Sequence, residues 1–248
     1  MKQEINVIGV IPARYASVRL PYKLLRKIRG KSLLQRTWEN ATDCHALDDL
    51  IIACDHQALY EEARKIGAKA VLTSLDHTSG TDRIAEAVSN IEAKIIINIQ
   101  ADEPLMHPSA IDSLAQEMLL HPDLAMTTVK TRINDALQIN DPAVVKVVCD
   151  CNGFALYFSR CPIPCDRDRK GSTYYKHLGV YAYTKDFLYT FKNLPPSKLE
   201  ETEKLEQLRA LEAGCPIKVI ETKFDSWGVD TERDLLRVEE ILIEKGNG

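Results

Sequence analysis

The chain has 248 residues, 45% of them hydrophobic and 27% charged, which is typical of an ordinary globular protein with a substantial core. Its formal net charge of −4 excludes a general nucleic-acid-binding role, because such proteins normally present a basic face. The first apolar run, residues 5–11, is too short and wrongly flanked for a secretory signal or a membrane span, so no membrane partner is expected.

The first half of the chain alternates between strand-like and helix-like patterns. Short apolar runs predict strands, and apolar residues three or four positions apart predict helices. The predicted strands are 5–11, 50–54, 70–73 and 95–99, and the predicted helices carry Leu34, Trp38 and Ala41, then Leu59, Ala63 and Ile66 up to Gly67, then Ile84, Val88 and Ile91, while the last begins at Pro108. This β-α-β-α order predicts an α/β fold with a mainly parallel sheet covered by helices on both sides.

The second half has a different character. The pair Asn152-Gly153 separates two strand-like runs and predicts a hairpin. Beyond it we expect a strand at 178–184, a helix carrying Leu205, Leu208 and Leu211, a strand at 217–222, and a last helix capped by Thr231 with Asp234 three residues on. No linker is visible, so residues 1–248 are predicted to form a single domain with a mixed-sheet elaboration at about 145–214. The odd number of cysteines, seven, favours reduced thiols and a cytoplasmic location.

Three cations, Arg14, Arg19 and Lys23, follow the first predicted strand within ten residues. In open parallel sheets, ligands bind beyond the carboxyl ends of the strands, so this loop lies where a ligand is expected. The segment has neither the GxGxxG of dinucleotide folds nor the GxxxxGK[ST] of phosphate-binding loops. Taken singly, each cation has an ordinary interpretation as a solvated surface charge; taken together, they predict a site for a polyphosphate.

Acidic residues lie at the ends of two later predicted elements. Asp102 and Glu103 come directly after the most apolar strand, in the segment NIQADEP, and Asp230 precedes the last predicted helix. Carboxylates in such places can hold Mg²⁺, which commonly bridges them to the phosphates of a substrate. The alternative is that Asp102 is a turn residue and that Asp230 caps the helix.

Seven segments, in register along nearly the whole chain, resemble one family. They are IPARYASVRLPYK (11–23), HTSGTDR (77–83), NIQADEP (98–104), ALYFSR (155–160), KHLGVYAY (176–183), LEQLRALE (205–212) and GVDT (228–231). The family is 3-deoxy-manno-octulosonate cytidylyltransferase, or CMP-Kdo synthetase. The resemblance implies a Rossmann-like nucleotidyltransferase fold and a magnesium-dependent homodimer in the cytoplasm. It also implies the activity, which is transfer of CMP from CTP to the anomeric hydroxyl of Kdo, releasing pyrophosphate, for lipopolysaccharide biosynthesis.

The resemblance also implies roles for individual residues. Arg19, Lys23 and Asp102 are expected to be catalytic, and Asp102 and Asp230 to bind magnesium. The residues expected to bind the nucleotide are Pro12, Ala13, Arg14, Arg19, Lys23, Ser79, Gly80 and Arg83. Those expected to bind the sugar are Gln100, Arg160, His177, Tyr181, Glu206 and Gln207, since arginine pairs with carboxylates and the other polar groups bind hydroxyls. Without the resemblance, His177 and Tyr181 would be interpreted as core residues, and Glu206 as the helical partner of Arg209.

Two departures and several alternatives accompany this resemblance. Tyr22 and Ala101 stand where the family usually has glycine, which matters if the backbone there needs a positive φ or a close approach. Within the same class of enzyme, sialic acid or 8-amino-Kdo is an alternative sugar. A nucleotide-binding module without catalysis is an alternative of another class, but a sensor has no need of both Asp102 and Asp230. Although Tyr22 and Ala101 replace glycine, every charged residue of the motifs is present.

Overall fold

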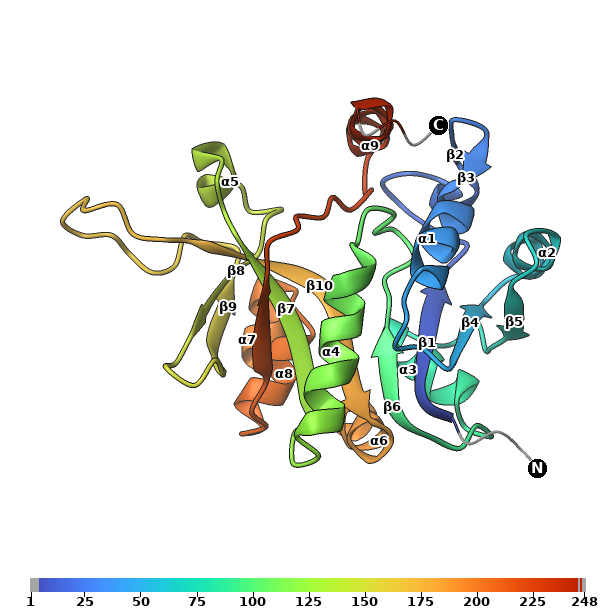
Figure 1. The fold of residues 1–248 in the computed structure, drawn as a ribbon, viewed down its shortest axis with the longest axis horizontal. Coiled ribbons are helices and arrows are strands. Elements are labelled where there is room, and N and C mark those ends of the chain that lie inside the picture. The colour runs from blue at the N-terminus through green and yellow to red at the C-terminus, as the bar shows by residue number, and fades with distance from the viewer. Residues whose placement is uncertain (1–4, 245, 247–248) are drawn as a thin grey trace.

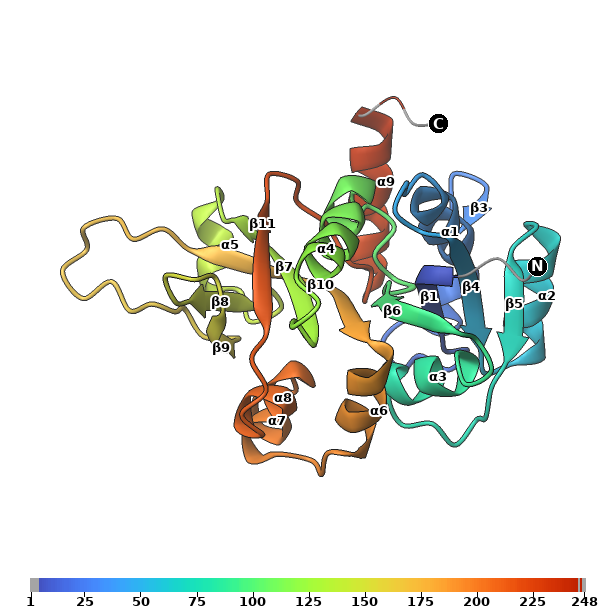
Figure 2. The same cartoon turned by 60° about the horizontal axis from the view of Figure 1, so that its bottom comes forward.

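A mixed β-sheet runs through the molecule and is covered by helices on both faces (Figures 1 and 2). The computed structural model describes residues 5–244 and 246. Within them, the strands of the main sheet follow the order β11-β7-β10-β6-β1-β4-β5, with β8 and β9 added beside β10. Their bounds are β1 Ile5–Ala13, β4 Asp49–Cys54, β5 Lys69–Leu72, β6 Ala93–Asn98, β7 Met126–Arg132, β8 Lys146–Cys149, β9 Ala155–Ser159, β10 Tyr175–Thr184 and β11 Lys218–Thr222.

Two hydrophobic clusters lie on opposite faces of this sheet because successive side chains of a strand alternate between faces. Along β1, Val7 and Ile11 join one cluster, whereas Ile8 and Val10 join the other. The first cluster is covered by α1 Leu33–Thr42, α2 Gln57–Lys65, α4 Pro108–Leu120 and α9 Glu232–Glu244, and the second by α3 Gly80–Ala87, α6 Lys185–Asn193 and α8 Gln207–Glu212. The remaining short elements are η1 Lys23–Leu25, β2 Lys27–Ile28, β3 Lys31–Ser32, α5 Ala136–Asn140 and α7 Lys198–Glu203.

The predicted parallel sheet is confirmed for β6, β1, β4 and β5, which pair in parallel in that order. The strand β10 then runs antiparallel between β6 and β7. Its second half pairs with β6, where Tyr181 lies opposite Asn98, so its first half extends past the carboxyl end of β6. The N-terminal half of β10 therefore lies at the same edge of the sheet as the C-terminal ends of the parallel strands.

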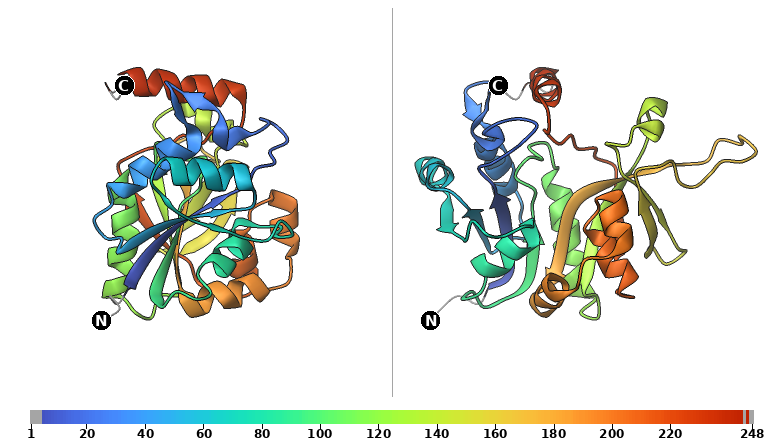
Figure 3. Two further views of the ribbon diagram at one scale, coloured as in Figure 1. Left: turned by 90° about the vertical axis from the view of Figure 1, so that its right-hand side faces the viewer. Right: turned by 180° about the vertical axis from the view of Figure 1, so that it is seen from behind.

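The predicted hairpin is also confirmed. Strands β8 and β9 pair antiparallel, and Gly153 in their connection has φ +81°. The segment that follows, residues 160–174, projects away from the sheet as a long and largely exposed arm (Figures 1 and 3). Since β10 lies inside the predicted elaboration, that region is continuous with the main sheet.

Some elements differ from the prediction. The strand β7 was not predicted, because its sequence MTTVKTR has no apolar run, yet Thr127 and Thr128 are fully buried in it. The helices α6 and α7 were also not predicted. Helix α3 ends at Ala87, so the expected Ile91 lies beyond it. The strand β7 depends on tertiary packing that local periodicity does not contain, whereas α6 and α7 carry local signals. Phe187, Leu188 and Phe191 lie at helical spacing in α6, and Ser197 with Glu200 forms a capping box at the start of α7.

Candidate active site

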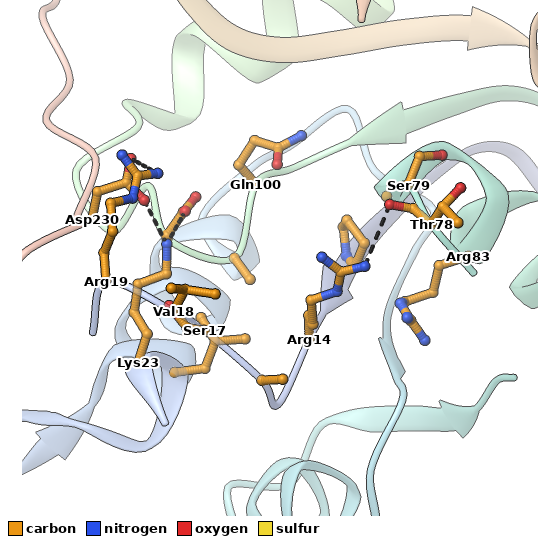
Figure 4. Close-up of a pocket in the computed structure, with 16 residues that line it drawn as sticks. Arg14, Ser17, Val18, Arg19, Lys23, Thr78, Ser79, Arg83, Gln100 and Asp230 are labelled. Atoms are coloured by element: carbon orange, nitrogen blue, oxygen red, sulfur yellow. Dashed lines mark hydrogen bonds and ion pairs between the residues drawn. The ribbon is translucent and has the colours of Figure 1, made fainter. Parts of the chain in front are cut away.

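The loop after β1 borders a cavity of about 470 Å³ (Figure 4), which we call the first cavity. Seven of the eight residues expected to bind the nucleotide line it; the exception, Ala13, is fully buried in β1. The predicted magnesium ligands line the same space. The lining residues that matter for the argument are Pro12, Arg14, Arg19, Lys23, Ser79, Gly80, Arg83, Gln100, Asp102 and Asp230.

The centre of the first cavity is a cluster of four alternating charges. The Lys23 ammonium contacts Asp102 Oδ2 at 2.5 Å and Asp230 Oδ1 at 3.0 Å, and Arg19 contacts the second oxygen of Asp230 at 3.0 Å. Burial alone lowers the pKa of Lys23, but attraction by Asp102 and Asp230 outweighs it and holds the pKa above the ordinary 10.5. The lysine is therefore charged, and the four groups neutralise one another.

The position of Asp230 decides between its two interpretations. The cap of α9 is made by its neighbours: Asp234 Oδ2 accepts from the Thr231 amide and hydroxyl, and the Asp234 amide donates to Thr231 Oγ1. The backbone amide of Asp230 also donates to Asp234. The Asp230 carboxylate is thus not the helix cap and is directed at Lys23 (Figure 4).

The donor set fits a hard divalent cation. Two carboxylates from distant segments converge on one point, which the Lys23 ammonium contacts, so this point already favours positive charge. No group of three or more His, Cys, Asp or Glu side chains that could hold a metal exists among residues 5–244 and 246. Two carboxylates still suit Mg²⁺, which keeps several waters and takes further oxygens from substrate phosphates.

The N-terminus of α3 forms another wall of the first cavity. Ser79 caps this helix by accepting from the Asp82 amide, and a side chain at Gly80 would lie 3.4 Å from Pro12 Cγ. Arg14 donates across the cavity to the carbonyls of His77 and Thr78. The 3.4 Å distance to Pro12 Cγ is ordinary van der Waals contact, so the packing of α3 against the end of β1 leaves room for a small side chain at position 80.

Arg83 lines the first cavity but is directed away from its centre (Figure 4). Its guanidinium is buried, donates to Thr73 Oγ1 at 2.6 Å and lies 3.4 Å from Asp55 Oδ2. Asp55 Oδ1 in turn accepts from the Tyr15 amide at 2.8 Å. The pair Arg83–Asp55 therefore fixes the start of the cationic loop. Arg83 supports this loop and does not occupy the position expected for a direct contact with the nucleotide.

A second cavity, of about 770 Å³, adjoins the first. It is lined by five of the six residues expected to bind the sugar, namely Gln100, Arg160, His177, Tyr181 and Gln207. The sixth, Glu206, lies outside this lining; its carboxylate accepts from Thr81 Oγ1, and burial raises its pKa. The two cavities share Arg19, Gln100, Asp102 and Asp230, so these residues lie where two ligands would meet.

Buried polar groups distinguish the second cavity from an ordinary surface hollow. Burial lowers the pKa of His177 to about 3, so its imidazole is neutral at pH 7, and Nε2 lies 2.9 Å from Thr128 Oγ1. Burial raises the pKa of Tyr181 far above its usual range. Gln207 is 3% exposed, and its Nε2 has no hydrogen-bond partner within the described part of the chain. An unmet donor in a cavity wall is a position that a ligand oxygen can satisfy.

The two departures from the family pattern have different structural outcomes. Tyr22 adopts φ +56°, a left-handed conformation that glycine accepts readily and that costs other residues about 1–2 kcal/mol. Its ring packs 4.9 Å from that of Tyr15. Ala101 is 5% exposed and is not among the residues with positive φ. Tyr22 therefore preserves the geometry of the loop under strain, whereas Ala101 needs no such conformation.

Sequence analysis missed several residues of the second cavity. Lys176, Trp227, Arg233 and Arg237 also line it. The Lys176 ammonium and the Arg237 guanidinium lie 4.5 and 3.5 Å from the centre of the Trp227 ring. Lys176 is the first residue of the quoted segment 176–183, and Trp227 lies next to the segment 228–231, so these positions were the available signal. With Arg19 and Arg160, these cations balance the five carboxylates of the same lining, and Lys176 is paired with Asp225 Oδ1 at 2.9 Å. An anionic ligand would therefore be bound by individual cations and not by a wall of net positive charge.

The fold and the shared edge of the two cavities define a nucleotidyltransferase: an α/β sheet with cations and paired carboxylates beyond its strand ends. The cytidylyltransferase family model matches residues 8–222. A 3-deoxy-manno-octulosonate cytidylyltransferase of Solibacter usitatus is 50% identical over 98% of this chain and 99% of its own, and that of Geobacter sulfurreducens is 44% identical over 96% and 100%. A solved CMP:2-keto-3-deoxy-manno-octonic acid synthetase, complexed with CTP, superposes with a TM-score of 0.92 at 39% identity, covering 97% of this chain and 99% of its own.

The chain therefore belongs to the 3-deoxy-manno-octulosonate cytidylyltransferase family, which confirms the resemblance found in its motifs. No helix of the described residues is long and apolar enough to span a bilayer.

Proposed function

We propose that the protein transfers CMP from CTP to Kdo, giving CMP-Kdo and pyrophosphate. The observation that carries this proposal is the shared edge of the two cavities, where Arg19, Gln100, Asp102 and Asp230 belong to both. The first cavity has the cations that a triphosphate needs, and the second has cations and buried polar groups suited to an acidic, hydroxyl-rich sugar. The relatives named above support the same pair of substrates.

In the proposed reaction, the anomeric hydroxyl oxygen of the sugar attacks the α-phosphorus of CTP. The new bond joins this oxygen to the α-phosphorus, the bond from that phosphorus to the bridging oxygen breaks, and the proton of the hydroxyl passes to the solvent. Pyrophosphate departs with the bridging oxygen. Lys23 and Arg19 are placed to hold the charge that develops on this leaving group, and cations fixed in position before the reaction stabilise such charge.

Asp102 and Asp230 are the residues that would hold Mg²⁺. The ion would offset phosphate charge and make the sugar hydroxyl easier to deprotonate. The Lys23 ammonium occupies the point on which both carboxylates converge. When the nucleotide binds, Lys23 would leave these carboxylates and contact phosphate oxygens instead.

The sugar would be recognised in the second cavity. A neutral His177 and the unmet amide of Gln207 would bind hydroxyls, and Arg160 and Lys176 would attract the carboxylate. We also propose a homodimer, supported by the projecting arm and by the exposed side chains of Leu137 in α5 and Leu156 in β9. Location in the cytoplasm and service to lipopolysaccharide biosynthesis stay expectations from the family resemblance.

The test is pyrophosphate release with CTP, Mg²⁺ and a panel of Kdo, 8-amino-Kdo and sialic acid. Turnover is expected with Kdo and is expected to stop when the metal is chelated. Turnover with another acidic sugar but not with Kdo would contradict the substrate while keeping the reaction. CTP binding without turnover of any sugar would instead favour a binding module. Light scattering at working concentration tests the dimer, and a monomer would contradict it.

A further inference from the structure

Lys146 is a fully buried lysine that neither substrate site includes. It begins β8, where it pairs with Ser159 of β9 and Lys176 of β10. Its ammonium donates to three backbone carbonyls, those of Asp141 at 2.9 Å, Val144 at 2.5 Å and Arg160 at 2.6 Å. The partners are thus main-chain groups of two separate segments and not a carboxylate.

This set of partners matches a charged lysine. An ammonium has three N–H donors, and three carbonyls face it, whereas a neutral amine would leave one carbonyl facing a lone pair. Burial lowers the pKa of Lys146, but three carbonyls that face its ammonium favour the fully protonated form. Removing the cation would take the donor from a buried hydrogen bond to Val144 and from two part-buried ones to Asp141 and Arg160, and the segments that bear these carbonyls would have to rearrange.

Arg160 extends this arrangement to a third segment. Its guanidinium donates to the carbonyls of Glu203 at 2.6 Å, Pro142 at 2.8 Å and Lys204 at 3.4 Å. The Glu203 carboxylate accepts from the Arg160 amide and from Ser159 Oγ. The two cations thus bind six main-chain carbonyls, and we call this set the carbonyl brace: Lys146 and Arg160 with the carbonyls of Asp141, Pro142, Val144, Arg160, Glu203 and Lys204.

The segments held by the carbonyl brace form one wall of the second cavity. Val144, Val145 and Arg160 line that cavity, as do Leu205 and Gln207, which lie one and three residues after the braced Lys204. The carbonyl of Val145 also accepts from the amide of His177, so the wall is tied to β10. Of the five N–H groups of Arg160, three make the hydrogen bonds given above within residues 5–244, which leaves two for a ligand.

We infer that Lys146 is a positioning residue of the second cavity: it holds Arg160 and the 203–207 segment in the geometry that receives the acidic substrate. This inference rests on the proposed function, which supplies the identity of that substrate. Lys146 acts through the main chain of Arg160 and touches no substrate itself. Its role therefore differs from that of the charged residues in the first cavity, because binding of CTP does not depend on it.

The test compares Lys146→Met with Lys146→Gln and with a matched control. The control is Lys218→Met, because Lys218 also donates to a carbonyl, that of Asn152, but lines neither cavity. In Lys146→Met, KM for Kdo is expected to rise at least tenfold while Kd for CTP changes less than twofold and kcat less than threefold. Lys146→Gln, which keeps two donors, should raise KM for Kdo by about threefold, and Lys218→Met should leave it unchanged.

An unchanged KM for Kdo in a cooperatively folded Lys146→Met would overturn the inference, and so would an equal loss of affinity for both substrates. If Lys146→Met does not fold, Lys146→Gln carries the test, because it alters the same three contacts and keeps two donors. An unchanged KM for Kdo in a cooperatively folded Lys146→Gln would then overturn the inference.

Failure of the proposed function would show itself separately, as absence of turnover of Kdo by the unaltered protein. The positioning role of Lys146 would then be tested by measuring amide hydrogen exchange in the absence of substrate. Amides of 143–147 and 203–207 should exchange faster together in the best-folded brace variant than in Lys218→Met. Equal exchange would overturn the positioning role whatever the substrate is.

Discussion

The pair Arg83–Asp55 allows the clearest separation of a structural role from a contact with the nucleotide. The two side chains are 2% and 6% exposed and lie 3.4 Å apart. Arg83→Met removes the cation and leaves the Asp55 carboxylate buried, with the Tyr15 amide still donating to it. Breaking such a buried pair from one side costs about 3–5 kcal/mol of the free energy of unfolding. For a chain of this length, each kcal/mol lowers Tm by about 2–4 °C, so a decrease of about 6–20 °C is expected.

The assay combines thermal melting with titration of CTP. If Arg83 acts through Asp55, Arg83→Met should melt early, and the double variant Asp55→Asn with Arg83→Met should recover much of the lost stability, because asparagine still accepts from Tyr15. CTP should then bind to the double variant with affinity close to that of the unaltered protein. A Tm within about 2 °C of the unaltered protein, combined with a tenfold loss of CTP affinity, would refute this reasoning and restore Arg83 as a direct contact.

Four further predictions concern the rest of the site. Lys23→Met should lower kcat by about 10²–10³-fold, because a preorganised cation is lost from the leaving group, and rapid-mix pyrophosphate assays showing less than a tenfold loss would contradict it. Asp230→Asn should nearly abolish turnover at every Mg²⁺ concentration but keep its Tm, since Thr231 caps the helix, and near-normal turnover would remove Asp230 from the site. The low pKa of His177, about 3 against 6.5, means that stability present above pH 6.5 is lost as pH falls toward 3. Between pH 7 and 4, urea unfolding of the unaltered protein should therefore lose about 3 kcal/mol more than that of His177→Gln, and parallel losses would refute the low pKa. Tyr22→Gly should keep or raise stability by up to about 1 kcal/mol, because release of the left-handed strain is partly offset by greater freedom of the unfolded chain, and a fall in Tm would show that the ring contact with Tyr15 matters more.

The elements that could be predicted from sequence are those whose burial shows in a short window. The run 95–99 lies in the centre of the sheet and is apolar except for Asn98, so it was recognised as a parallel strand. The strand β7 also has a neighbouring strand on each side, but its buried threonines look polar. The place of β10 between β6 and β7 could not be predicted at all, because an apolar pattern indicates a strand without indicating its neighbours.

The site shows the same limit at the level of single side chains. The cationic loop and the acidic segments were found because they follow strands in the chain, and the structure brings Lys23, Asp102 and Asp230 together. The direction of Arg83 depends on Asp55, which lies 28 residues away in sequence and has no motif of its own. Lys146 gave no signal either, since a lysine between valines in VKVV predicts an exposed face of a strand.

The contact between Lys23 and Asp230 spans 207 positions of the chain. Contacts of such long range form late in folding, because the entropy of closing the intervening loop must be overcome before they contribute. The charge cluster can assemble only after β1, β6 and the segment leading to α9 have reached their places. A chain released from the ribosome before α9 has docked would carry the cationic loop and Asp102 without the second carboxylate. Recovery of turnover during refolding should therefore follow the slowest step of the chain, after most of its helix signal has returned.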